Sequence, residues 1–209
     1  MHIAIVGAGS VGRAVATGLK RAGHTITLGV RDPGKDDLAG FAASIEVDIQ
    51  TPAAAAGAAD LIVLSVPWAA AESAVKSLGA LNGKVLIDCT NPLGRVDGKM
   101  QLVVGHTTSA AEMIQGWATD ARVVKSLNQV GAEIMADASK LGGKPVMFVA
   151  GDDEAARKIA AGLVEDLGFE ALDAGLLMQA RYLEPFAMVW INQAIFRGEG
   201  RSWAFGAIR

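Results

Sequence analysis

The chain has 209 residues, of which 51% are hydrophobic and 20% are charged, and its formal net charge is −3. This balance gives no basic patch for nucleic acid, and the single cysteine, Cys89, excludes both a disulfide framework and a zinc site built on cysteines. No stretch free of charged residues approaches the roughly 18 that span a bilayer, and no signal-like segment opens the chain, so we expect a cytoplasmic protein that does not enter membranes.

The first thirty residues predict a strand, a glycine turn, a helix and a second strand. Residues 3–6 are a short apolar run, apolar residues recur at helical spacing over 11–22, and 25–30 form a second apolar run. The turn between them is Gly7, Ala8, Gly9, Ser10, Val11 and Gly12, a G-x-G-x-x-G sequence. In this context the sequence predicts a dinucleotide site.

Each glycine of the turn has a physical role in such a site. Gly7 permits the tight turn, Gly9 lets the backbone approach a pyrophosphate, and Gly12 lets the helix pack closely on the strand. The pyrophosphate is expected at the helix N-terminus, where unpaired N–H groups and the helix dipole favour an anion.

The residues after the second strand indicate which nucleotide binds. Arg31 and Lys35 supply two cations that can converge on a 2′-phosphate, and the guanidinium of an arginine matches phosphate oxygens in a bidentate way. Asp32 precedes Pro33, and we interpret it as the N-cap of a helix that begins at the proline. In the alternative, Asp32 binds the ribose hydroxyls of NAD. We therefore predict NADP in preference to NAD.

Strands and helices are expected to alternate through the rest of the chain. We expect short strands at 45–47, 61–64, 85–88 and 122–126, of which 61–64 is a continuous apolar run, and helices at 34–43, 51–59, 69–78 and 109–118. Beyond Asn128 we expect a helix over 132–141, a strand at 145–150, a helix to about 167, an edge strand at 170–172 and a long helix over 176–196, kinked or restarted at Pro185.

This order is typical of an α/β fold with a doubly wound parallel sheet. We expect one Rossmann-type domain over 1–209, with a nucleotide-binding core of about 1–127 and a small α/β extension over about 128–209. Ligands of such sheets bind beyond the carboxyl ends of the strands. Ser65 and Asn91 follow two strands and suit ribose or carboxamide contacts, or they cap turns. Trp68 either stacks on a ring or packs within the protein.

The sequence offers few groups for acid–base catalysis. The three histidines are His2, His24 and His106, the only tyrosine is Tyr182, and no Cys/His cluster supports a catalytic metal. We identify no catalytic residue and expect no metal site. Reduction of a ketone or imine requires a positioned proton donor, whereas hydride transfer between two redox rings requires mainly distance and alignment, which favours the second reaction.

The chain resembles the NADP oxidoreductase family that depends on the deazaflavin coenzyme F420. The matching segments, in family order, are GAGSVG, VRDPGK, LSVPWAAA, DCTNPLG, VVKSLNQVGAE, GDDEAARK and DLGFEALDAGLLMQARYLEPFAMVWI, and they span nearly the whole chain. The resemblance implies a Rossmann-type domain with a small C-terminal extension, a homodimer, and hydride transfer between NADPH and the deazaflavin ring.

The resemblance also implies roles for individual residues. It assigns the phosphates of NADP to the turn from Ala8 to Gly12, the 2′-phosphate to Arg31 and Lys35, and the nicotinamide side to Val66, Pro67 and Trp68. The second ring is expected near Asn128, Gln129 and Val130 and near Met178, Arg181 and Tyr182. In two places the chain departs from the reductases: Val30 replaces a serine before the arginine, and Asn128 replaces a histidine beside the deazaflavin.

We expect an NADPH-dependent oxidoreductase with a small-molecule redox partner, a deazaflavin or a flavin-like acceptor. One alternative is NADPH-dependent reduction of a small imine or carbonyl compound. Another is a non-catalytic NADPH-binding sensor, because fold does not fix function and acid–base residues are few.

Overall fold

The computed structural model describes residues 1–34 and 36–209. In this part of the chain eight strands form one sheet in the order β10-β9-β8-β5-β4-β1-β2-β3. Their bounds are β1 (His2–Val6), β2 (Thr25–Gly29), β3 (Asp48–Gln50), β4 (Leu61–Leu64), β5 (Val85–Asp88), β8 (Arg122–Lys125), β9 (Val146–Gly151) and β10 (Glu170–Gly175). The section from β3 to β8 has the doubly wound order with its switch between β1 and β4, so the predicted α/β fold is confirmed.

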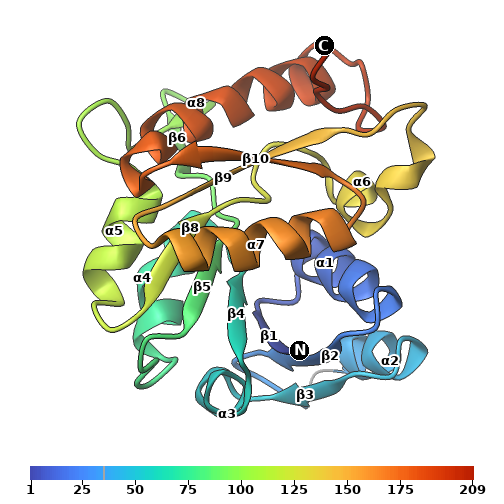
Figure 1. Ribbon diagram of the computed structural model, residues 1–209, viewed down its shortest axis with the longest axis vertical. Coiled ribbons are helices and arrows are strands. Elements are labelled where there is room, and N and C mark those ends of the chain that lie inside the picture. Colours follow the sequence, from blue (N-terminus) through green and yellow to red (C-terminus); the bar gives the residue numbers. More distant parts are fainter. Residues whose placement is uncertain (35) are drawn as a thin grey trace.

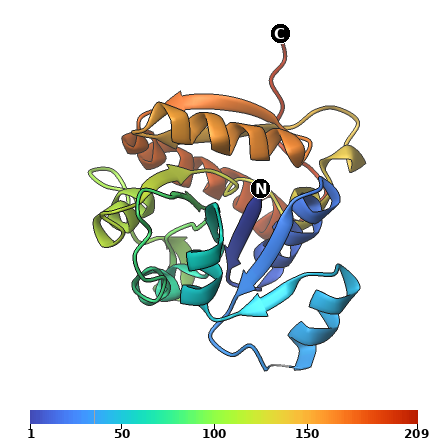
Figure 2. The same cartoon turned by 60° about the horizontal axis from the view of Figure 1, so that its bottom comes forward.

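Helices cover both faces of the sheet, while β9, β10 and α8 lie at one end and β3, α2 and α3 at the other (Figures 1 and 2). The α-helices are α1 (Ser10–Arg21), α2 (Asp36–Ser44), α3 (Pro52–Ala58), α4 (Trp68–Lys76), α5 (Ala110–Trp117), α6 (Ala132–Ala136), α7 (Glu154–Asp166) and α8 (Ala180–Ile191). Short helical turns are η1 (Ala138–Lys140), η2 (Leu177–Gln179) and η3 (Asn192–Phe196).

Alternate residues of the strands belong to two hydrophobic cores. In β1, Ile3 and Ile5 pack with α1, α6 and α7, whereas Ala4 and Val6 pack with α3, α4 and α5. A strand buried on both faces is apolar throughout, which is why residues 61–64 form an unbroken apolar run in the sequence. The two cores hold the carboxyl ends of the six mutually parallel strands, β1 to β5 and β8, along one edge of the sheet.

Polar side chains cap the N-termini of α5 and α7. At α5 the hydroxyl of Ser109 accepts from the N–H of Glu112 and donates to its carboxylate. At α7 the carboxylate of Asp153 accepts from the N–H of Ala156 at 2.7 Å.

The structure corrects several predicted elements. A hairpin of β6 (Leu93–Val96) and β7 (Lys99–Leu102) occupies a segment expected to be a loop. The strand expected at 45–47 is wrong, because Glu46 has a positive φ of 54° in the turn after α2 and β3 begins at Asp48. Strands β8 and β9 pair antiparallel in the otherwise parallel sheet.

Three helix boundaries also differ. The helix expected from Pro33 begins at Asp36, and Asp32 accepts a hydrogen bond from the N–H of Gly34, so its interpretation as an N-cap is wrong. The helix over 132–141 ends at Ala136, and η1 follows. The last helix restarts at Ala180 after η2 and continues through Pro185.

Candidate functional site

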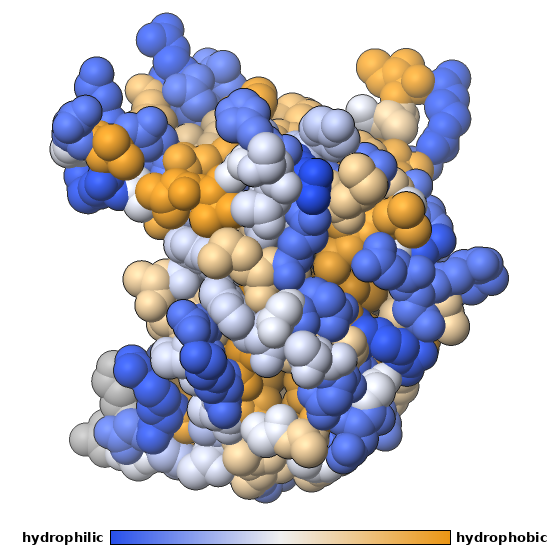
Figure 3. Space-filling view, turned by 90° about the vertical axis from the view of Figure 1, so that its left-hand side faces the viewer, coloured by the Kyte–Doolittle hydropathy of each residue, from blue (hydrophilic) through white to orange (hydrophobic). Residues whose placement is uncertain are grey.

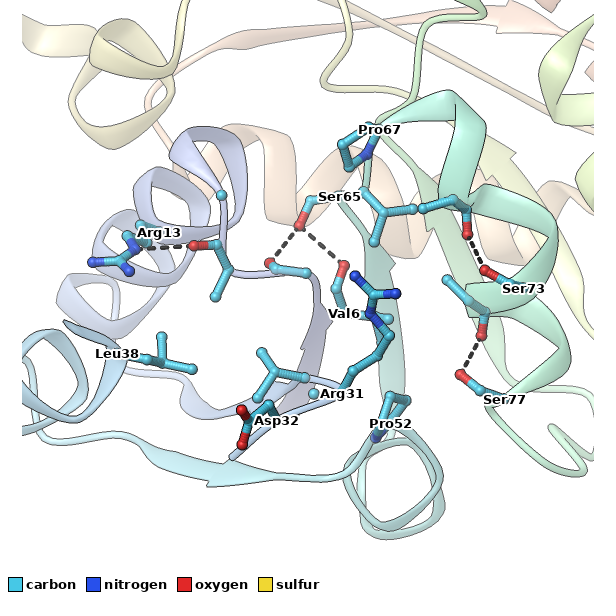
Figure 4. Close-up of a pocket in the computed structure, with 18 of the residues that line it drawn as sticks. Val6, Arg13, Arg31, Asp32, Leu38, Pro52, Ser65, Pro67, Ser73 and Ser77 are labelled. Atoms are coloured by element: carbon cyan, nitrogen blue, oxygen red, sulfur yellow. Dashed lines mark hydrogen bonds between the residues drawn. The ribbon is translucent and has the colours of Figure 1, made fainter. Parts of the chain in front are cut away.

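A cavity of about 830 Å³ lies at the carboxyl ends of β1, β2 and β4, at the switch point of the sheet. Its walls are the glycine turn after β1, the segment after β2, the start of α2, and one face of α4 (Figure 4). Gly7, Ala8, Gly9, Val30, Arg31, Ser65, Val66 and Pro67, all predicted ligand contacts or their neighbours, line it together. The switch point is where sheets of this order bind ligands.

The three glycines of the turn differ in what surrounds them. A Cβ at Gly7 would lie 2.8 Å from the carbonyl oxygen of Ser65, and Gly7 has a φ of 101°. A Cβ at Gly12 would lie 1.9 Å from the carbonyl oxygen of Gly7. Gly9 has nothing within 4 Å of this position. Gly7 and Gly12 are therefore required by packing, whereas Gly9 leaves open space for a ligand.

The N-terminus of α1 opens at the same turn. Gly9 is its N-cap, and no side chain accepts a hydrogen bond there. The first N–H groups of a helix have no partner within the helix, so they attract an anion. These features fit the pyrophosphate of a dinucleotide.

Ser65 fastens the glycine turn to the neighbouring strand. Its hydroxyl donates to the carbonyl oxygens of Gly7 at 2.9 Å and of Val6 at 3.2 Å. It comes directly after β4 and still lines the cavity (Figure 4). The hydroxyl thus positions the turn while leaving the oxygen at the cavity wall.

Arg31 extends into the cavity between the wall formed by α1 and the wall formed by α4 (Figure 4). It is exposed, and within the described part of the chain its guanidinium forms neither a hydrogen bond nor an ion pair. Lys35, the second cation predicted for the 2′-phosphate, lies outside the described residues. An arginine that extends into the cavity with its donors unused suits a phosphate.

Arg13 is a cavity residue that was not singled out in the sequence. Its Nε donates to the carbonyl oxygen of Ala8 at 2.9 Å, its Nη2 lies 2.9 Å from the carboxylate of Asp37, and its guanidinium lies 5.0 Å from the ring centre of Phe41. Arg13 therefore braces the glycine turn against α2. The sequence feature that could have indicated this role is the positively charged residue directly after Gly12, the last glycine of the motif.

Trp68 and Asn91 contact other protein groups. Trp68 stacks on Trp117 of α5, with ring centres 5.6 Å apart. The amide of Asn91 donates to the backbone carbonyl of Asn128 at 2.8 Å and accepts from the side-chain amide of Asn128 at 3.0 Å. These two asparagines, the asparagine pair, join the segments that follow β5 and β8.

Asn128, Gln129 and Val130 are buried, and none of them lines the cavity of the glycine turn. Asn128 is only 5% exposed, and its Oδ1 has no hydrogen-bond partner among the described residues. The side chain of Gln129 pairs with the backbone of β9, donating to Val146 and accepting from Phe148. Val130 belongs to the hydrophobic core.

A second cavity, of about 670 Å³, separates the segment after β7 from α8. Leu102, Val103, Val104 and Pro185 make its walls apolar, and His106, Arg181 and Tyr182 add polar groups. Of the residues predicted beside a second ring, Arg181 and Tyr182 line this cavity, and Met178 is exposed one turn earlier on the chain. The buried segment at 128–130 does not line this cavity, although Asn128 donates to the carbonyl oxygen of Leu183, next to Tyr182.

Arg181 is held by a carboxylate of α5. Its Nη2 and Nε lie 2.6 Å and 2.9 Å from the two carboxylate oxygens of Glu112. The hydrogen bond from Arg181 holds the pKa of Glu112 below its ordinary value, and Ser109 adds to the effect. This bidentate pair fixes the orientation of Arg181 at the second cavity.

The described residues form no candidate metal site and no candidate membrane span. No group of three or more His, Cys, Asp or Glu side chains is arranged there to hold a metal ion. None of the helices in these ranges is both long and apolar enough to cross a membrane.

Comparisons with known proteins agree with this geometry. The family model described as NADP oxidoreductase, coenzyme F420-dependent, matches residues 2–92. The crystal structure of a protein from Arthrobacter sp. FB24, proposed to be an F420-dependent NADP reductase, is 33% identical with a TM-score of 0.92, and the match covers 99% of each chain.

Two other similar proteins are larger. The metalloreductase STEAP3 of Rattus norvegicus is 28% identical over 186 residues, which are 89% of this chain and 36% of STEAP3, so the chain spans about a third of that curated relative. An imine reductase from Myxococcus stipitatus in complex with NADP⁺ is 15% identical with a TM-score of 0.71, and the match covers 95% of this chain and 63% of that one. This second likeness shows a shared fold.

Proposed function

This chain belongs to the coenzyme F420-dependent NADP oxidoreductase family, and we propose from this premise that it transfers a hydride between NADP(H) and a deazaflavin or flavin-like acceptor. It is an NADP-dependent oxidoreductase, and the acceptor is the part that we propose. When bound, NADPH supplies the hydride, which the acceptor ring takes up together with a proton from solvent.

The chemistry of the nucleotide cavity is the observation that carries this proposal. The ionisable side chains that line it in the described residues are Arg13, Arg31, Asp32 and Asp37, all on the side of α1, β2 and α2. On the side expected for the nicotinamide the lining residues are Ser65, Val66 and Pro67, and none of them has an ionisable side chain. Hydride transfer between two rings needs alignment rather than an acid, so this composition suits a ring acceptor.

The second cavity offers a suitable surface for an acceptor ring. Its walls are mostly apolar, as flat ring systems require, and the few polar groups at Arg181 and His106 can fix an orientation. Both walls connect to the asparagine pair: Val103 donates to the carbonyl oxygen of Pro92, next to Asn91, and Asn128 donates to the carbonyl oxygen of Leu183 in α8.

Reduction of a small imine or carbonyl compound is the second candidate. It is favoured by His106 and Tyr182, which line the second cavity and are able to donate a proton. A comparison of acceptors separates the two functions.

NADPH oxidation should be followed spectroscopically with a deazaflavin, with FMN, and with a panel of imines and ketones at equal concentrations. We expect turnover with the deazaflavin or FMN. Turnover with the imines and ketones alone would assign the second function. Tight NADPH binding without turnover on any acceptor would instead indicate a nucleotide sensor.

We also propose that the active form is a homodimer. Exposed residues recur at three- and four-residue spacings along η2, α8 and η3, at Met178, Tyr182, Pro185, Val189, Asn192 and Phe196. Figure 3 shows apolar side chains between hydrophilic ones on the upper part of the side that carries α5 and the start of α8. A stripe of this kind on a helix suits contact with a second copy.

A further inference from the structure

Three charged side chains are buried together at the carboxyl ends of β5 and β8. The Nζ of Lys125 lies 2.9 Å from a carboxylate oxygen of Asp88 and 3.0 Å from one of Glu184, and it also donates to the carbonyl oxygen of Thr90. The side chains of Lys125 and Asp88 are 0% exposed and that of Glu184 is 1% exposed. We name these three residues the ionic cluster.

The ionic cluster joins elements that are far apart in the sequence. The carboxylate of Glu184, in α8, accepts from the N–H groups of Ala110 at 2.9 Å and Ala111 at 3.2 Å, which open α5. The carboxylate of Asp88 accepts from the N–H of Thr90 at 2.8 Å. One ammonium group therefore fixes α8, the start of α5 and the segment after β5 to the central sheet.

The same segments carry the groups that face the proposed acceptor. Glu184 lies between Leu183, whose carbonyl oxygen accepts from Asn128, and Pro185, which lines the second cavity. In the asparagine pair, Asn91 directly follows Thr90, and Asn128 lies three residues after Lys125. Moving the ionic cluster would therefore move both the α8 wall of the second cavity and the asparagine pair.

Within the ionic cluster, neighbouring opposite charges offset the effect of burial on the pKa values. Burial alone would lower the pKa of Lys125, but the two carboxylates outweigh it and hold the pKa above its ordinary value. Burial raises the pKa of Glu184, Lys125 opposes this, and Asp88 adds to it. Removing one partner leaves an uncompensated charge in the interior, so the neighbouring elements must shift or admit water.

We propose that Lys125, Asp88 and Glu184 are positioning residues that set the α8 wall of the second cavity, and through it the binding of the acceptor. The inference rests on the proposed function, because it takes the second cavity as the acceptor site. Neither the three residues of the ionic cluster nor the asparagine pair lines the nucleotide cavity, so we expect nucleotide binding to change little when the cluster is altered.

The test uses Glu184→Gln in the full-length protein. The amide nitrogen of a glutamine cannot accept from a backbone N–H, so one of the contacts to Ala110 or Ala111 is lost. We expect the KM for the deazaflavin or FMN to rise about tenfold, as a displaced wall implies. The Kd for NADPH should stay within about twofold of the wild type, since its cavity lies elsewhere.

The control is Leu163→Ala in α7, a core substitution at a residue that lines neither cavity, which lowers the unfolding free energy without removing a charge. If its KM for the acceptor rises as much as that of Glu184→Gln, the effect is general destabilisation and the inference is wrong. An unchanged KM in Glu184→Gln would also overturn it.

Amide hydrogen exchange measures the position of α8 without any acceptor, so it tests the inference independently of the proposed function. Amides of residues 180–184 and 186 should exchange about tenfold faster in Glu184→Gln than in Leu163→Ala, whereas residues 7–21 in Glu184→Gln should exchange as in the wild type. If no flavin or deazaflavin reacts with the wild type, the proposed acceptor fails, and the exchange rates still decide whether the ionic cluster positions α8. Equal exchange over 180–186 in both variants would overturn the inference.

Discussion

Arg31 is the side chain on which the choice of nucleotide depends. It extends into the cavity with its donors unused by the described residues, whereas the carboxylate of Asp32 is bound to the N–H of Gly34. We expect Arg31→Ala to weaken NADPH binding by about ten- to a hundredfold, because hydrogen bonds to a charged group contribute about 1.5–3 kcal/mol each. Calorimetric titrations with NADPH and NADH would measure this.

NADH lacks the 2′-phosphate and should lose much less affinity in the same variant. Arg95→Ala, in the hairpin away from the cavity, serves as the matched control and should bind both nucleotides as the wild type does. An equal loss for NADPH and NADH in Arg31→Ala would mean that Arg31 does not read the phosphate.

Gly9 and Gly12 make a second comparison at the level of single residues. A Cβ at Gly12 would lie 1.9 Å from the carbonyl oxygen of Gly7, so Gly12→Ala should lower the melting temperature as well as the affinity for NADPH. A Cβ at Gly9 meets no protein atom within 4 Å. Gly9→Ala should therefore melt within a few degrees of the wild type and lose NADPH affinity, because the methyl group occupies the ligand's space.

The two measurements are thermal unfolding without nucleotide and calorimetry with NADPH. A Gly9→Ala protein that binds NADPH normally would show that the backbone at Gly9 does not face the pyrophosphate. The roles of these glycines could be predicted from the motif, whereas the ion pair of Arg13 with Asp37 could not, since it depends on where α2 lies.

At the scale of elements, the contact between α5 and α8 holds the wall of the second cavity. Ser109, Glu112 and Arg181 form a hydrogen-bonded chain across it. Because Arg181 holds the pKa of Glu112 below its ordinary 4.5, the folded state is stabilised by the ionised form above that pH. This stabilisation is lost as the pH falls through the lowered pKa of the folded state.

We therefore expect Glu112→Gln to be less stable than the wild type near neutral pH, and the difference to shrink as the pH falls below 4.5. Urea unfolding at a series of pH values measures it. In an Arg181→Met background the same substitution should cost much less at every pH, since the main cause of the shift is gone. If the stability difference between Glu112→Gln and the wild type is constant with pH, it does not arise from the lowered pKa of Glu112.

Elements were predictable where a single segment determines them. The Asp97-Gly98 hairpin shows a missed local signal: both residues have positive φ, 50° and 75°, as a two-residue hairpin turn requires. The segment at 45–47 has the β-branched residues Ile45 and Val47, as a strand would, but it forms the turn that follows α2. The conformation of residues 45–47 therefore depends on the preceding helix rather than on their own sequence.

At the scale of the whole molecule, the exposed stripe of α8 and η3 predicts the oligomeric state. Val189 is 49% exposed and Tyr182 is 67% exposed on the same stripe. A charge there should prevent contact with a second copy, so we expect Val189→Glu to be a monomer by light scattering under conditions where the wild type is a dimer.

The matched control is Ile159→Glu, which introduces the same charge at an exposed apolar residue of α7 and should leave the dimer intact. A wild type that is monomeric at all concentrations, or a Val189→Glu protein that remains a dimer, would contradict this use of the stripe.

Long-range arrangement limited what the sequence could predict about the site. Asp88 and Lys125 each end an apolar strand, and they are partners in register between β5 and β8, 37 residues apart. Their pairing follows only once the strand order is known. Likewise Asn128 follows a strand, as a residue that contacts a ligand would, but it is buried and hydrogen-bonded to Asn91 and to Leu183 of α8. The turn at the switch point was predictable because one short segment contains it.

The most direct test of the proposed hydride transfer follows a label from the nucleotide to the acceptor. NADPH carrying deuterium at the transferable position of C4 should be incubated with the protein and a deazaflavin, whose ring carbon retains the hydrogen it receives. We predict deuterium on that ring carbon by mass spectrometry, in a yield equal to the NADPH consumed. A reduced deazaflavin without deuterium, or NADPH that is consumed only when an imine or ketone is present, would contradict the account.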